Sequence, residues 1–303
     1  MKKQGIIQTQ LGKALESERY ALILAMVLAA IPYMGWLAEA LIAFVTLRKG
    51  AKVGVQLLLP VILVHTLLSV FAFPVYVALT IATLNVLPCF VAAWVLKKTK
   101  SWQQVAFSLF GLVVLGVMLL HLVLPSFITE QFKHLEMILE GLYSSTTEIL
   151  SFWQQKGISR EALANYLVGI QATSIVFSSL IPVFLARSIQ AQLFYPGGFR
   201  NEVLHFRANK YGLLVFLALS MAAFSNVYLA MNVLPMVLFY YVLAGLSVGA
   251  YMFSRMRPLV AGLILIVPLI LLAWVMMPLY FLIGIIDSLC NARVLMTSKM
   301  KEV

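Results

Sequence analysis

The sequence predicts an all-α fold: a polytopic transmembrane bundle of about ten helices with a small helical hairpin on the outer side. Of 303 residues, 62% are hydrophobic and 11% are charged, and the mean hydropathy is +0.98. A soluble domain carries about 25% charged residues. Apolar stretches long enough for a bilayer span, about 20 residues, recur along the chain. This composition excludes a water-soluble enzyme.

The chain begins with a polar stretch, residues 1–20, expected on the cytoplasmic side. Ile7, Leu11 and Leu15 fall on one face of a helix. The stretch is either an amphipathic helix held on anionic lipid by its lysines or a solvated tail.

The first apolar block, residues 21–47, is interrupted by Pro32 and Gly35. Its 27 residues fit one long tilted helix or a hairpin of two short helices. A third interpretation is a signal peptide, since Ala38-Glu39-Ala40 resembles a cleavage site. The polar region before it is long and carries Glu16 and Glu18, and the apolar stretch resumes after Ala40, which argues against this.

The following spans have clearer limits. The joint between the last two of them is expected around Asn232. The closing block, 259–289, again allows one kinked helix or a hairpin, whose outer turn would lie near Met276–Pro278. In order, the spans between the end blocks are 53–71, 75–96, 105–124, 164–186, 211–230 and 234–253.

The basic residues favour hairpins at both ends and therefore ten helices; single spans there would give eight. With hairpins, 19 of the 22 basic residues fall in cytoplasmic segments. This split follows the positive-inside rule. The net charge of +11 is thus explained by basic residues in the segments that face the cytoplasm, and nucleic-acid binding is not expected. The three basic residues expected on the outer side are Lys133, Lys156 and Arg160.

We expect a single integral membrane domain, 1–303, in the bacterial cytoplasmic (inner) membrane with both termini inside. The outer segment 126–163 has helical periodicity, and Ser145-x-x-Glu148 is a capping box for a second short helix that Gly157 would end. It is a lid or partner surface, or an amphipathic hairpin on the membrane. The polar segment 187–210 is expected as a cytoplasmic loop.

Enzyme motifs are missing from the sequence. It contains no phosphate-binding glycine loop, no HExxH and no GxSxG. The four histidines are far apart, and the two cysteines, Cys89 and Cys290, have no CxxC spacing. We therefore expect no enzyme activity, no metal and no cofactor.

Polar residues inside the spans are the candidate functional groups, because they are costly in a membrane. Glu39 could simply reach water at the first outer turn. Asp287, with Asn291 and Arg293 nearby, suggests a structural polar clamp. The remaining candidates could contact a solute or pack helices together. They are His65, Asn85 and the stripe Gln171, Ser174 and Ser178.

Small residues repeat every fourth position on the first apolar helix, at Ala21, Ala25 and Ala29. Such a face lets another helix approach closely. The partner is either a helix of the same chain or a separate subunit.

Two motifs resemble the YybS-like bacterial membrane proteins, a family of unknown function. The first is the segment from Arg187 and Gln190 to the turn Pro196-Gly197-Gly198-Phe199; the second is the tail Gly284-x-x-Asp287 with Arg293. The tail departs from the family by carrying Leu-Cys-Asn-Ala before the arginine. The family is thought similar to substrate-binding subunits of energy-coupling-factor importers, which dock a coupling subunit through an alanine face.

Two functions follow as expectations. One is a solute-binding or transport-related subunit in the lipid bilayer that takes energy from a coupling subunit and separate ATPases. The alternative is a non-transport scaffold or assembly factor that recruits partners through its cytoplasmic loops. The small-molecule ligand stays unidentified.

Overall fold

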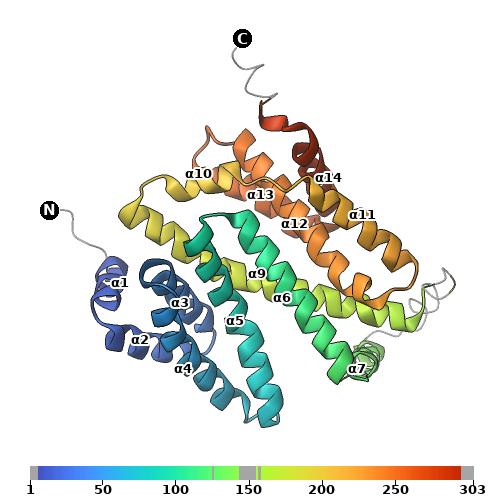
Figure 1. Ribbon diagram of the computed structural model, residues 1–303, viewed down its shortest axis with the longest axis horizontal. Helices are drawn as coiled ribbons and strands as arrows, with labels where there is room; N and C mark the ends of the chain where they lie inside the picture. The colour runs from blue at the N-terminus through green and yellow to red at the C-terminus, as the bar shows by residue number, and fades with distance from the viewer. Residues whose placement is uncertain (1–5, 125, 143–154, 156–157, 295–303) are drawn as a thin grey trace. The chain divides into compact units, whose positions relative to one another are not determined.

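The computed structural model describes residues 6–124, 126–142, 155 and 158–294, and this part of the chain contains helices and turns but no strand (Figure 1). The described helices are α1 (Ile6–Glu16), α2 (Glu18–Ala30), α3 (Gly35–Lys49), α4 (Ala51–Ser69), α5 (Val75–Thr99), α6 (Trp102–Val123), α7 (Phe127–Leu142), α9 (Arg160–Phe194), α10 (Gly198–His205), α11 (Tyr211–Phe224), α12 (Tyr228–Met252), α13 (Pro258–Leu271) and α14 (Ala273–Cys290).

All ten expected spans are helices, but they differ in length. Six described helices are long and apolar enough to cross a membrane: α4, α5, α6, α9, α12 and α14. This fits a membrane-embedded protein. The other four, α2, α3, α11 and α13, have 13 to 15 residues. At 1.5 Å per residue they reach only about 20–23 Å of a core about 30 Å thick. The number of crossings therefore stays a prediction.

The chain divides into two compact units, where the sequence suggested one domain. The first unit comprises residues 1–109 and 174–201, and the second comprises 110–173 and 202–303. The boundaries fall inside α6, inside α9 and inside α10.

The first unit is built around α2, α3, α4 and α5. Ser17 caps α2 by accepting a hydrogen bond from the Tyr20 amide at 3.3 Å. The turn between α2 and α3 contains Tyr33 with φ 63°, and Gly50 with φ 108° joins α3 to α4. A glycine suits this last position because side chains disfavour positive φ. The first apolar block is thus two helices, of which α2 packs on both α3 and α4.

In the second unit, α12 packs along α14 and α11. The closest approach of α12 and α14 is at Gly245 and Gly284. A Cβ on Gly245 would lie 1.9 Å from the Tyr280 carbonyl oxygen, and one on Gly284 would lie 2.1 Å from that of Tyr241. Only glycine permits this contact.

Two expected turns were placed wrongly. The joint before α12 lies at residues 225–227, where Asn226 has φ 60°, and Asn232 is fully buried inside α12. The closing block breaks at Leu272, not at Met276–Pro278. Pro278 lies inside α14, because a membrane helix tolerates proline when its neighbours satisfy the freed carbonyl.

The expected cytoplasmic loop 187–210 is mostly helical. Helix α9 has 35 residues and continues to Phe194, and α10 follows. Gly197, with φ 84°, forms the turn between them. A polar sequence marks where a helix leaves the membrane, not where the helix ends. In the segment 126–163, α7 is a helix, as the periodicity of that segment predicts. The capping box at Ser145 and the stop at Gly157 lie outside the described residues.

Candidate functional site: two polar networks in the second unit

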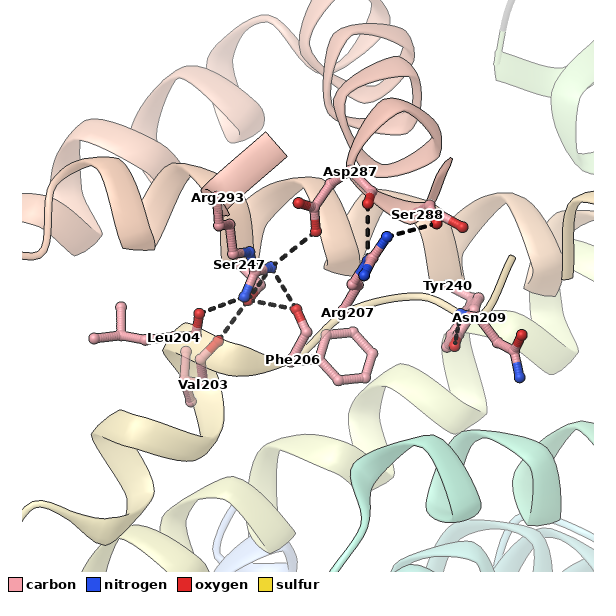
Figure 2. A network of polar contacts seen from close by, with 10 residues as sticks. All are labelled: Val203, Leu204, Phe206, Arg207, Asn209, Tyr240, Ser247, Asp287, Ser288 and Arg293. Carbon is pink, nitrogen blue, oxygen red and sulfur yellow. Dashed lines mark hydrogen bonds and ion pairs between the residues drawn. The ribbon is translucent and has the colours of Figure 1, made fainter. Parts of the chain in front are cut away.

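A buried ion pair lies at the end of α14. Asp287 is fully buried and Arg293 is 7% exposed, and Arg293 Nη2 lies 3.3 Å from Asp287 Oδ2 (Figure 2). Asn291, in the left-handed conformation, ends α14 and turns the chain back so that Arg293 reaches Asp287. Within the described residues neither carboxylate oxygen of Asp287 has a hydrogen bond. The guanidinium of Arg293 is therefore what compensates this carboxylate.

Arg207 caps the same helix from the segment before α11. Its Nε and Nη2 donate to the carbonyls of Asp287 and Ser288, at 2.8 and 2.9 Å. The last carbonyls of a helix lack intrahelical donors and carry partial negative charge, so a cation there is stabilising.

Arg293 in turn binds the end of α10 and the residue that follows it. Its guanidinium donates to the carbonyls of Leu204 and Phe206 and to Ser247 Oγ, the last at 3.2 Å. Burial lowers the pKa of Arg293, and the Asp287 carboxylate opposes that shift. We call Arg207, Ser247, Asp287 and Arg293 the arginine clasp. It ties the tail after α14 to the segment between α10 and α11.

A second network joins α6, α9 and α12. Asn232 Oδ1 lies 2.8 Å from His121 Nε2, and Asn232 Nδ2 donates to the Asn165 carbonyl at 2.7 Å and to Asn165 Oδ1 at 3.0 Å. A carbonyl oxygen only accepts, so this arrangement places a proton on His121 Nε2. We call His121, Asn165 and Asn232 the amide cluster.

The helices come unusually close at this cluster. A Cβ on Gly169, one turn after Asn165, would lie 2.4 Å from the Asn232 carbonyl oxygen. Nearby on the same helix, Gln171 accepts a hydrogen bond from Gln131 of α7 at 3.1 Å. Helices α7 and α12 thus each form a side-chain hydrogen bond to α9, and α6 is joined to α12 through His121.

The clasp and the cluster lie at opposite ends of α12. Ser247 follows Asn232 by 15 residues, which is about 22 Å along a helix. The amide cluster combines the end of α6 with the starts of α9 and α12. Under the threading that the basic residues predict, the cluster lies toward the outside and the clasp toward the cytoplasm.

The alanine face of α2 is covered by its own chain. Ala21, Ala25 and Ala29 are 0–4% exposed and belong to the core of the first unit, together with residues of α3, α4 and α5. Of the two partners that the sequence allowed, the structure has the internal one. The face is not available for docking a separate subunit.

Glu39 does not reach water as expected. It lies in the second turn of α3 and is only 9% exposed. His65 packs against Gly35, one turn earlier, and is half-buried. Asn85 is exposed, and its carbonyl accepts from Ser179 at 3.4 Å.

The remaining candidates are spread over both units. Gln171 is half-buried in the second unit, while Ser174 and Ser178 are exposed. The buried serine of this helix is Ser179, which the sequence did not single out.

The residues that carry the family resemblance form two separate groups. Arg187 Nη1 donates to Gln190 Oε1 at 2.5 Å, and Phe199 packs 6.1 Å from Phe184 between ring centroids. Pro196 is exposed in the turn before Gly197 and Gly198. The tail residues Asp287 and Arg293 belong to the clasp.

The amide cluster was missed because its members are single polar residues far apart in sequence. In the sequence, His121 is one of four scattered histidines, and Asn232 lies where a turn is expected. The usable signal was Asn165 followed by Gly169, a polar and a small residue on one face of a long span.

Across the described ranges, no three His, Cys, Asp or Glu side chains lie close enough to hold a metal ion. Comparisons with protein-family models, curated proteins and solved structures give no match.

Proposed function

We propose that this protein is a solute-binding, transport-related membrane subunit, with the amide cluster as its solute contact. The observation that carries the proposal is the convergence of His121, Asn165 and Asn232 inside an otherwise apolar bundle. Polar groups are expensive in a membrane, and where they gather they commonly mark a solute path.

The chemistry of the cluster suggests the class of solute. The Asn165 and Asn232 amides donate and accept hydrogen bonds and carry no charge, and the His121 ring nitrogen adds a further donor. A polar, uncharged organic solute is therefore the ligand that they suit best. His121 is half-buried and so offers an edge to such a solute, whereas Asn232 is enclosed.

The resemblance to YybS-like proteins supports a place in the bacterial inner membrane, and the distribution of basic residues supports both termini inside. A coupling subunit, if one binds, must use a surface other than the alanine face. The scaffold alternative has less support, because the clasp holds the segment 203–209 against its own chain and leaves less of that cytoplasmic segment to recruit partners.

The test is native purification in mild detergent, with mass spectrometry of the small molecules and proteins that copurify. Wild type should retain a polar solute, and His121→Leu should retain about 5- to 150-fold less, as expected for 1–3 kcal/mol of lost hydrogen bonding. Ser225→Ala, at an exposed serine that follows α11 in the same unit, is the matched control and should bind normally. If cell-envelope proteins copurify and no solute does, the scaffold alternative is favoured.

A further inference from the structure

Glu39 is a buried acid that the amide cluster and the clasp do not use. Its side chain is enclosed by the core of the first unit at 9% exposure. In the part of the chain that the structure describes, its carboxyl group has no ion pair and no hydrogen bond; only its backbone carbonyl accepts, from Cys89 Sγ at 3.6 Å.

The basic residues of this unit gather at the far end of α3. Lys49 lies 3.9 Å from Glu18, and Lys97 Nζ donates to the Arg48 carbonyl. Lys49 follows Glu39 by ten residues, which is about 15 Å along the helix. These cations are too far away to compensate a carboxylate at position 39.

The titratable groups beside Glu39 on α4 and α5 are an imidazole and a thiol, and among the described residues neither forms an ion pair with its carboxyl group. From α5 the thiol of Cys89 is fully buried beside it. From α4, His65 lies one turn away against Gly35. The titratable residues of α2 are Glu18, Arg19 and Tyr20, at its first turn, which lies near the opposite end of α3.

An ionised carboxylate with apolar surroundings and no partner costs so much free energy that the group takes up a proton instead. We propose that Glu39 is a proton-binding site within the membrane part of the first unit. The turn between α2 and α3 gives it a route to water: Tyr33 there is 96% exposed, and the turn is about 7 Å from Glu39 along the helix. This site is independent of whether the protein binds a solute.

Carbodiimides test the site directly, because only a protonated carboxyl adds across their C=N bond. The carboxyl oxygen bonds to the central carbon, the proton goes to nitrogen, and an acyl shift leaves a stable N-acylurea with no leaving group. The full-length protein in phosphatidylcholine–phosphatidylglycerol vesicles is treated with the apolar dicyclohexylcarbodiimide or with a water-soluble carbodiimide, and peptides are mapped by mass spectrometry.

The apolar reagent should modify Glu39, and the rate should fall about tenfold per pH unit once the pH exceeds its titration midpoint. The water-soluble reagent should modify the exposed Glu161 and spare Glu39. Asp287, paired with Arg293, is the internal control and should react with neither. Glu39→Gln, a neutral isostere, should remove the adduct and keep the melting temperature at neutral pH.

Three results would overturn the proposal. One is modification of Glu39 by the water-soluble reagent as fast as Glu161, which would mean a hydrated carboxylate. Another is no reaction with the apolar reagent at any pH in protein with a native melting temperature. The third is a large fall in melting temperature for Glu39→Gln, which would mean that the folded state needs the charge.

Discussion

At the scale of single residues, the arginine clasp is a reciprocal arrangement. Arg207, before α11, binds carbonyls at the end of α14, and Arg293, after α14, binds carbonyls at the end of α10 and just beyond it. Each guanidinium donates hydrogen bonds to backbone carbonyls at a helix end, where carbonyls lack donors from their own helix. Asp287 sits between them and depends on Arg293 for its charge balance.

Removing one partner of the buried pair should be strongly destabilising. Arg293→Ala leaves the Asp287 carboxylate buried and uncompensated, which typically costs about 3–5 kcal/mol. Denaturant unfolding of the detergent-solubilised protein measures this cost. Arg255→Ala, at an exposed arginine just after α12, is the control and should change stability by less than about 0.5 kcal/mol. Equal effects of the two changes would mean that the clasp adds no stability.

Gly169 is a second residue whose role can be isolated. Gly169→Ala places a Cβ 2.4 Å from the Asn232 carbonyl oxygen and must push α9 from α12. Overpacking of this kind costs about 1–3 kcal/mol. Gly116→Ala is the control in the same unit, since nothing lies within 4 Å of its added Cβ, and helix propensity predicts a gain of up to about 1 kcal/mol. In thermal unfolding, Gly169→Ala should lower the melting temperature and Gly116→Ala should raise it or leave it unchanged. A rise for both variants would contradict the close contact between α9 and α12.

At the scale of elements, the alanine face of α2 is the surface on which α3 and α4 of the first unit pack. Small side chains every fourth residue let α3 and α4 pack closely on this 13-residue helix. An isolated helix of that length is marginal, so its order depends on this packing.

Enlarging one alanine of this face should therefore lower stability. Ala25 is fully buried, and Ala25→Leu should cost about 1–3 kcal/mol through overpacking and lower the melting temperature. Ala30→Leu, on the exposed side of the same helix, should leave it unchanged. An unchanged melting temperature for Ala25→Leu with loss of a bound protein would show instead that the face docks a partner.

The sequence predicts features that depend on one local segment, such as the position of a helix. It does not predict contacts between segments that lie far apart in the chain. Hydropathy located the apolar blocks, the basic residues favoured a hairpin in each end block, and Asp287 with Arg293 was recognisable because the two lie close together in the chain. The His121–Asn232 contact joins residues 111 positions apart, and no local pattern encodes it. Leu272 carries no turn signal either, so the break before α14 depends on tertiary packing.

At the scale of the whole molecule, each unit separately has a basic end. In the first unit, Lys97 Nζ donates to the Arg48 carbonyl at 2.8 Å, so α3 and α5 end side by side. In the second unit, Arg293 donates to Ser247 near the end of α12, and Arg207 donates to carbonyls at the end of α14 (Figure 2). Basic groups held together at helix ends are what the positive-inside rule expects of a cytoplasmic face.

Topology measurements test this sidedness for both units. After replacement of Cys89 and Cys290, a single cysteine at Asn226 should react with an impermeant maleimide in intact cells, whereas cysteines at Lys100 or Asn201 should react only after permeabilisation. A reporter fused after Val303 should read cytoplasmic, because α13 and α14 turn back on each other at Leu272 and Tyr280 Oη donates to the Leu265 carbonyl across that turn at 3.1 Å. Reversal of all four readings would mean inverted threading and a failed charge argument. Reversal of the reporter alone would mean that the short α13 enters the membrane without crossing it.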